Sequence, residues 1–171
     1  MLVAVLMLCG SLIASGQSSL KGRTQVLLER VFPTASSFSD KQAAPPHYKV
    51  YSKDPSGSRT LLGVAFWTTE IEPLERGYDG PIKILVGLDM NGRLTGIAVA
   101  EHHEPYGNFS VDRPEFAEQF IGKSIRDPFK VGSDIQAVSR ASISVSSATR
   151  AIRNSSRRIA RQLLPPPTAA P

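Results

Sequence analysis

The chain has 171 residues, the usual size of one domain, so an assembly of several domains is not expected. With 41% hydrophobic and 20% charged residues, it can bury a core, which excludes a wholly disordered protein. The single cysteine, Cys9, excludes an intrachain disulfide and any metal site built from several thiolates. Redox chemistry would therefore need an organic cofactor.

The beginning of the chain is typical of a secreted protein. Residues 1–14 form an uncharged apolar run as long as the hydrophobic region of a signal peptide, and Ala14-Ser15-Gly16 is a suitable cleavage site. An uncleaved anchor is the alternative, although the run is short for a bilayer span of about 20 residues. We predict a signal peptide at 1–16, one domain at 17–164 and a disordered tail at 165–171.

The positive charge is concentrated in one segment. Five arginines between residues 145 and 164 account for the whole net charge of +5, and no acidic residue lies among them. A solvated basic helix face is the simplest interpretation, and steering of an acidic redox partner is the alternative. Nucleic acid is not an expected partner of an exported protein. The arginines are Arg150, Arg153, Arg157, Arg158 and Arg161.

The first half of the domain predicts one helix followed by a hairpin. Apolar residues recur at helical spacing over 18–32, and Pro33 ends this pattern. Residues 34–46 are rich in Ser, Ala and Pro, which predicts a loop. β-branched and aromatic residues at 47–53 and 59–69 flank a turn at 54–58, which predicts two paired strands.

The second half predicts another hairpin and two helices. Strands at 81–89 and 94–102 flank Asn91-Gly92, the dipeptide most typical of a hairpin turn. Pro114 begins a short helix that ends at residue 120. A long helix follows from Ser144 and ends before the prolines at 165–167. The order of elements predicts an α+β fold, in which an antiparallel sheet has helices packed on one face and a long C-terminal helix.

Two motif-like segments do not meet the requirements of the sites that they suggest. Gly122-Lys123-Ser124 lacks the upstream glycine of a phosphate-binding loop. In the segment Glu101-His102-His103-Glu104, successive side chains of a continuing strand would point to opposite faces. Neighbours then cannot share one ion, and no metal site is predicted.

The stretch GYDGPIKILVGLDMNGRLTGIAVAEHHEPYG at 77–107, with QAVSRASIS at 136–144, resembles the FMN-binding domain family. This family includes exported flavin subunits of the Rnf and sodium-pumping quinone reductase complexes, and the N-terminal domain of the nitrous oxide reductase regulator. Residues 101–105 make the resemblance closest to that regulator. The resemblance implies FMN as the cofactor.

The family's flavin motif reads approximately Asp-x-x-Ser/Thr-Gly-Ala-Thr, and a flavin transferase joins its last threonine to FMN through a phosphoester. By this resemblance, Ser142 takes the place of the flavin-bearing threonine and keeps the alcohol group. Gln136 replaces the Asp and Arg140 replaces the Gly. Glycine suits a backbone of positive φ, whereas Arg140 could pair with the phosphodiester anion.

The resemblance also implies which segments converge on the flavin: a turn, a strand end with its loop, and the loop before the last helix. Tyr78, Tyr106 or Phe109 is expected to lie against the flavin ring. The expected cofactor-binding residues are Gly77, Tyr78, Gly80, Glu101, His102, Glu104, Ser139, Arg140, Ala141, Ser142 and Ser144.

By this resemblance the chain is an exported FMN-binding electron carrier, rather than an enzyme with its own substrate. Its expected partners are a flavin transferase and membrane or periplasmic redox proteins. The first alternative is a flavin-free accessory module that docks on a membrane redox complex or assists metalloenzyme maturation. The second is a small flavin reductase, for which Glu101, His102 or Glu104 would be the general acid.

Overall fold

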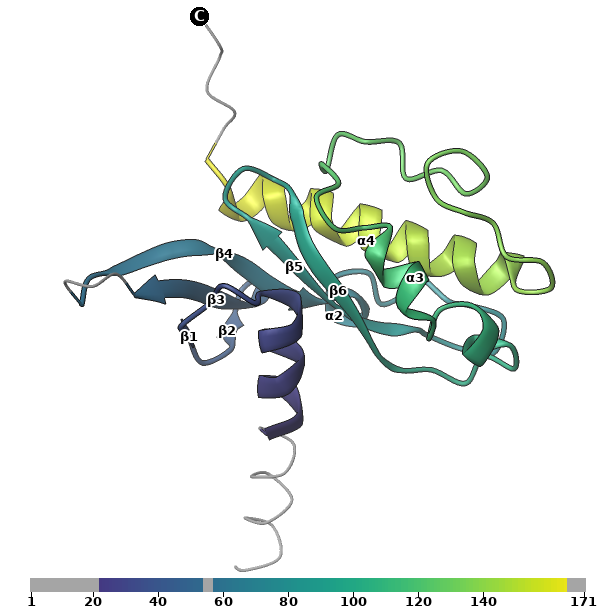
Figure 1. Cartoon of the computed structure of the whole chain (residues 1–171), viewed down its shortest axis with the longest axis horizontal. Helices are drawn as coiled ribbons and strands as arrows, with labels where there is room; N and C mark the ends of the chain where they lie inside the picture. Colours follow the sequence, from purple (N-terminus) through teal and green to yellow (C-terminus); the bar gives the residue numbers. More distant parts are fainter. Residues whose placement is uncertain (1–21, 54–56, 166–171) are drawn as a thin grey trace, which may run out of the picture.

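The computed structural model describes residues 22–53 and 57–165, and Figure 1 shows their arrangement. The predicted signal peptide and residues 166–171 of the predicted tail lie outside these ranges. Six antiparallel strands form one sheet in the order β1-β3-β4-β5-β6, with β2 paired to β3. The strands are β1 (Ser37–Phe38), β2 (Gln42–Ala43), β3 (Pro46–Lys53), β4 (Arg59–Trp67), β5 (Lys83–Asp89) and β6 (Leu94–Glu101).

Helical segments connect and cover the strands. Residues 22–31 are helical and precede the sheet, which confirms this part of the predicted first helix. The others are α2 (Thr68–Ile71), the 3₁₀ turn η1 (Gly107–Phe109), α3 (Pro114–Glu118) and α4 (Ser142–Leu163). The predicted α+β class, the antiparallel sheet and the long C-terminal helix are confirmed.

Both predicted hairpins form. Strands β3 and β4 pair from Tyr48 opposite Ala65 outward, and β5 pairs with β6 around the turn that contains Asn91-Gly92. The Asp89 carboxylate closes this turn by accepting the N–H groups of Asn91 and Arg93, each at 2.8 Å.

The predictions were wrong in two local details of this region. The strand predicted to reach residue 69 ends at Trp67, because Thr68 begins α2 and its hydroxyl accepts the Ile84 N–H at 3.1 Å. The loop predicted at 34–46 contains the short strands β1 and β2. Backbone pairing with β3 orders these two segments, and their composition did not signal it.

The sheet carries a hydrophobic cluster on each face. Because side chains alternate along a strand, Val64 and Phe66 of β4 join the cluster beneath α3 and α4, whereas Ala65 and Trp67 join the other cluster. The helix at 22–31 packs into that second cluster through Leu28 and its neighbours. The predicted packing of helices on one face therefore holds for α2, α3 and α4 but not for this helix.

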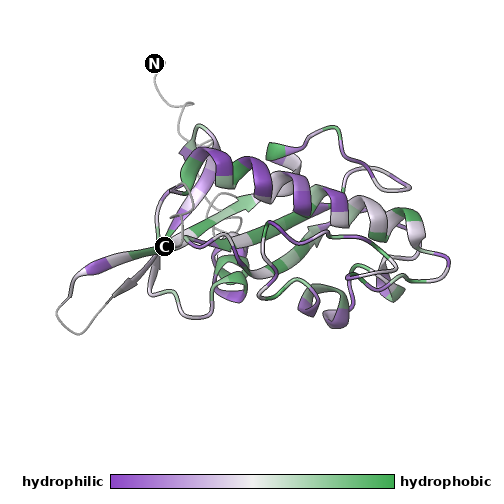
Figure 2. Ribbon diagram, turned by 90° about the horizontal axis from the view of Figure 1, so that it is seen from above, coloured by the Kyte–Doolittle hydropathy of each residue, from purple (hydrophilic) through white to green (hydrophobic). Residues whose placement is uncertain are grey.

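Helix α4 lies across the sheet with an apolar stripe against it. Val145, Ala148, Ile152 and Ile159 are buried at the spacing of one helix face. In Figure 2, hydrophilic and hydrophobic residues alternate along this helix, and mostly hydrophobic strands lie behind it. Ser142 is already helical, so α4 begins two residues earlier than predicted. Within the described ranges, no helix has the length and apolar character to cross a bilayer.

Candidate functional site

A buried carboxylate joins the three segments that the sequence predicted to converge. Glu104 is 6% exposed, and its two oxygens accept the N–H groups of Tyr78 and Asp79, each at 3.0 Å. The hydroxyl of Ser144, in the first turn of α4, donates to the same carboxylate. Glu104 therefore connects the turn at 77–80, the loop after β6 and the beginning of α4. We call Glu104, Tyr78, Asp79 and Ser144 the carboxylate cluster.

Hydrogen bonds keep this carboxylate ionised despite its burial. Desolvation raises the pKa of Glu104, but the hydrogen bonds from Ser144, Asp79 and Tyr78 together outweigh it. The net result is a pKa below the usual value of a glutamate. The carboxylate cluster is therefore a fixed negative charge whose partners are all donors.

Two glycines shape the turn that holds Glu104. Gly77 donates its N–H to the carbonyl of Gly80 at 2.7 Å, which closes the turn. A Cβ atom on Gly77 would lie 2.3 Å from Oε1 of Glu104, so any side chain there would displace the carboxylate. Gly80 has φ +114°, which a residue with a side chain rarely adopts. Both predicted site residues thus position backbone N–H groups.

His102 orients the loop that carries Glu104. Its Nδ1 accepts the Glu104 backbone N–H at 3.0 Å, and its Nε2 lies 2.8 Å from Oδ1 of Asp112. Because Nδ1 is an acceptor, we place the ring proton on Nε2, which donates to Asp112. His102 thus supports the loop rather than presenting a free acid to a substrate. The sequence pattern did not identify Asp112, whose partner lies ten residues earlier.

Ser142, the predicted attachment residue, lies at the exposed beginning of α4. The residue before it, Ala141, has no side chain that caps the helix, and no acidic residue lies in the first turn. The first N–H groups of α4 and the Ser142 hydroxyl therefore have no hydrogen-bond partner in the described part of the chain. Such groups bind anions, phosphate above all.

Arg140 adopts the backbone conformation that a glycine would favour. Its φ is +67°, in the left-handed region. This region costs a residue with a side chain about 1–2 kcal/mol. The backbone conformation expected of a glycine at this position therefore persists, and the exposed Arg140 side chain lies two residues before Ser142.

Some predicted residues do not reach the carboxylate cluster. Glu101 pairs instead with Lys83 at 2.7 Å, and the Lys83 ammonium lies 5.0 Å from the ring centre of Trp67, in the hydrophobic cluster on the opposite face from α4. Tyr78 and Phe109 have 70% and 71% of their surface exposed, so their rings are not packed within the protein. Ser139 is exposed in the segment before α4.

One pocket lies beside the predicted attachment segment. It has a volume of about 360 Å³, and its lining includes Phe109, Phe116, Gln136 and Ser139. Gln136 is anchored there because its N–H donates to the Gln119 side chain at 2.6 Å. This pocket is a candidate position for an aromatic group close to Ser142.

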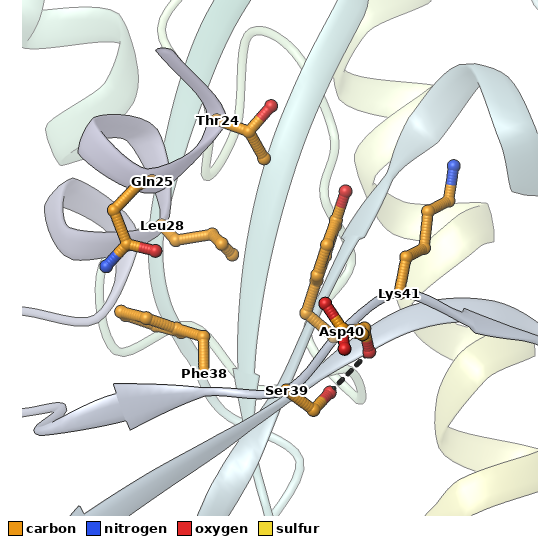
Figure 3. A pocket seen from close by; sticks show the side chains of 8 residues that line it. Thr24, Gln25, Leu28, Phe38, Ser39, Asp40 and Lys41 are labelled. Atoms are coloured by element: carbon orange, nitrogen blue, oxygen red, sulfur yellow. Dashed lines mark hydrogen bonds between the residues drawn. The ribbon is translucent and has the colours of Figure 1, made fainter. Parts of the chain in front are cut away.

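A pocket of similar size belongs to the other face of the sheet. Figure 3 shows it between the helix at 22–31 and residues 38–41, with Leu28 and Phe38 facing each other and Ser39 bonded to the Asp40 carbonyl. It is lined by none of the predicted cofactor-binding residues. Across the described residues, no three His, Cys, Asp or Glu side chains are arranged to hold a metal ion.

An ion pair outside the predicted set strengthens the beginning of α4. Glu75 accepts the Ser147 hydroxyl at 3.1 Å and pairs with Nη2 of Arg150 at 2.7 Å. This connects the segment after α2 to α4, close to the carboxylate cluster. No local pattern signalled it, because the partners are more than seventy residues apart.

The geometry agrees with a comparison to known families. Residues 77–156 match the family model of the FMN-binding domain, a range that contains the carboxylate cluster, Arg140 and Ser142. The chain belongs to the FMN-binding domain family through this segment, and FMN is the cofactor that the match indicates.

The similar proteins are components of one kind of assembly, the ion-translocating oxidoreductase complex. The chain is 30% identical over 137 residues to one component of this complex from Stutzerimonas stutzeri, covering 72% of this chain and 57% of that protein. A shorter segment of 61 residues is 43% identical to the same component from Pseudomonas aeruginosa strain UCBPP-PA14, covering 33% of this chain and 28% of that protein. The chain thus spans little more than half the length of the first relative. These relatives support the Rnf branch of the resemblance, and the likeness to the nitrous oxide reductase regulator stays a prediction.

Proposed function

We propose that this chain is an exported electron-transfer domain that carries FMN through a phosphoester on Oγ of Ser142. The observation that carries the proposal is the position of Ser142, exposed at the uncapped beginning of a 22-residue helix and within the matched family segment. When bound, FMN supplies one-electron and two-electron redox chemistry, while the protein supplies position and electrostatics.

The local charges suit a phosphodiester. The free N–H groups of the first turn and the positive end of the helix dipole both favour an anion next to Ser142. The Arg140 guanidinium is close enough in sequence to pair with the same group. The Glu104 carboxylate does not compete for these N–H groups, because Tyr78, Asp79 and the Ser144 hydroxyl occupy its oxygens.

The attachment is an exchange at one phosphorus atom. Oγ of Ser142 attacks the phosphorus of FAD that belongs to its FMN half, forming a new O–P bond. The P–O–P bond breaks, AMP leaves, and the hydroxyl proton passes to a base of the transferase. This reaction consumes no oxidant or reductant, and it needs an exposed hydroxyl, which Ser142 has.

Burial distinguishes Ser142 from the buried serine beside it. Ser144 is 4% exposed and its hydroxyl donates to Glu104, so an incoming donor cannot reach it without breaking the carboxylate cluster. Ser139 is exposed, but it lies outside α4 and lacks the free N–H groups of a helix end. Phe109 shares a pocket with Ser139, which supports this ring as a contact of the flavin.

Export and the redox partners extend the proposal. The apolar run at 1–14 supports export, which would place the domain in the periplasm. The relatives belong to an ion-translocating oxidoreductase complex, which supports docking on a membrane redox complex. Outside the cytoplasm a lost flavin is not easily replaced, so a covalent bond would keep it for the life of the protein.

Intact mass spectrometry tests the attachment. The chain is produced in exported form together with a flavin transferase, as wild type, Ser142→Ala and the control Ser139→Ala. We expect wild type and Ser139→Ala to be yellow and heavier by FMN less water, and Ser142→Ala to lack the adduct. An adduct that persists in Ser142→Ala would contradict the assignment. A colourless, unmodified wild-type chain would favour the flavin-free accessory module, which the replacements Gln136 and Arg140 favour.

A further inference from the structure

A pocket along α4 is not used by the proposed function. It has a volume of about 380 Å³ and lies between α4 and the loop at 128–131. Helix α4 lines it with Ser146, Thr149, Arg150 and Arg153. Residues at these spacings share one side of a helix, and the first of them lies one turn beyond Ser142. We call it the α4 pocket.

A buried hydroxyl in the α4 pocket has no partner. Thr149 is 1% exposed, and its Oγ1 makes no hydrogen bond within the described residues. A buried polar group without a partner costs about 1–3 kcal/mol and calls for a specific explanation, such as an absent ligand. Ser156 has a similarly unpartnered hydroxyl on the same helix but does not line this pocket. It therefore provides a matched control.

The α4 pocket is positively charged. Its lining contains Lys130, Arg150 and Arg153 and no acidic residue. Glu75 lies outside the lining and neutralises Arg150 at 2.7 Å. Arg153 donates through Nε to the uncharged Asn154 side chain at 3.1 Å, so its charge is not balanced by this contact.

Lys130 adds a second unbalanced charge. The nearby Asp134 accepts the backbone N–H of Lys130 but forms its ion pair with Lys123, at 3.1 Å. In the part of the chain that the structure describes, the Lys130 ammonium has no acidic partner. Two cationic side chains are thus available to a ligand.

The loop opposite α4 has a strained backbone at Phe129. Its φ is +51°, in the left-handed region, which is unusual for an aromatic residue. The ring is buried and stacks on Phe120 with centroids 6.1 Å apart, so packing holds the strained conformation in place. Strained residues of this kind occur preferentially at binding sites.

We propose that the α4 pocket binds a phosphate group, either free or as part of a small phosphorylated molecule. Thr149 Oγ1 donates one hydrogen bond, and Arg153 and Lys130 supply the charge. A phosphate monoester carries about 1.5 to 2 negative charges at pH 7, which matches these two cations. The guanidinium group also offers paired donors to phosphate oxygens. The site shares no residue with the proposed flavin attachment.

A titration followed by NMR tests the proposal. Inorganic phosphate is added to the Ser142→Ala chain, which carries no flavin under the proposed function, with chloride adjusted to hold ionic strength constant. We expect saturable shifts of the amides at 128–131 and 146–153. Thr149→Val and Arg153→Gln should each raise the dissociation constant about tenfold, the value of a hydrogen bond to a charged group. Ser156→Ala should leave it unchanged.

Additional arms identify the ligand and guard against unfolding. Tighter binding of glycerol phosphate than of phosphate would assign a phosphorylated molecule, and equal binding would assign free phosphate. Acetate that binds as well as phosphate would overturn the proposal, as would shifts that do not saturate or an unaltered affinity in Thr149→Val. That variant should melt no lower than its parent, because it removes an unpartnered buried hydroxyl. A failure of flavin attachment would not alter any of these results.

Discussion

The two ends of α4 use their polar groups in opposite ways. At the beginning, the Ser142 hydroxyl and the Thr149 hydroxyl have no partners among the described residues. Towards the end, Arg157 donates to the carbonyls of Ile125 and Asp127, both at 2.8 Å, and Arg158 donates to that of Ile71 at 3.0 Å. One end is open to ligands, while the other stabilises neighbouring loops.

This contrast changes the interpretation of the basic segment. Arg158 also pairs with Glu72 at 3.1 Å, and Arg150 pairs with Glu75. Much of the apparent excess charge is therefore held in contacts within the molecule, and a uniformly solvated basic face is not what the structure shows. Unbalanced charge is concentrated near the beginning of α4, where Arg140 and Arg153 lie.

The largest expected effect concerns the carboxylate cluster at the open end. Glu104→Ala should lower the free energy of unfolding by about 3 kcal/mol, because three donors lose their buried acceptor. Urea denaturation measures this change. The control Glu101→Ala removes an exposed ion pair and should cost less than about 1 kcal/mol. Equal effects of the two substitutions would show that the cluster does not hold this end together.

The pH dependence of the same site sharpens this prediction. The pKa of Glu104 is lowered in the folded protein, so its ionisation stabilises the fold above the unfolded-state pKa near 4.5. This stabilisation should disappear as the pH falls through the lower folded-state pKa. The stability difference between wild type and Glu104→Gln should therefore shrink in acid. A difference that grows in acid would contradict the assigned ionisation.

At the other end of α4, Arg157→Met tests the closed half of the comparison. This substitution keeps much of the apolar length but leaves the carbonyls of Ile125 and Asp127 without their donor, and should cost about 1–2 kcal/mol. Hydrogen exchange of the amides at 122–131 should accelerate. The exposed Arg161, changed to Met, is the control and should have little effect. Unchanged exchange in Arg157→Met would mean that the loop is held by other contacts.

Arg140→Gly should have a smaller and opposite effect. Glycine relieves the left-handed backbone conformation, so the substitution should stabilise the protein by up to about 1 kcal/mol in thermal unfolding. Arg140→Ala keeps the strain and removes the side chain, which separates the two contributions. A loss of stability in both variants would instead show that the guanidinium makes a stabilising contact.

Local patterns were sufficient for much of the fold. The turn at Asn91-Gly92 and the alternation of β5 and β6 predicted that hairpin, because its chemistry lies within a few residues. The apolar spacing from Val145 onward likewise predicted α4. The resemblance to flavin domains placed Glu104 and Ser144 in the site, but it did not indicate that these side chains bond each other.

The sequence by itself determined the class of fold, the order of its main elements and the family, because turn dipeptides, side-chain periodicity and motif residues are local. The tertiary structure alone decided that Glu104 is a buried acceptor, that Ser144 is occupied while Ser142 is free, and that Arg157 holds a distant loop. These outcomes depend on which groups meet across 30 to 40 residues of chain, and solvent exclusion at those contacts sets their strength.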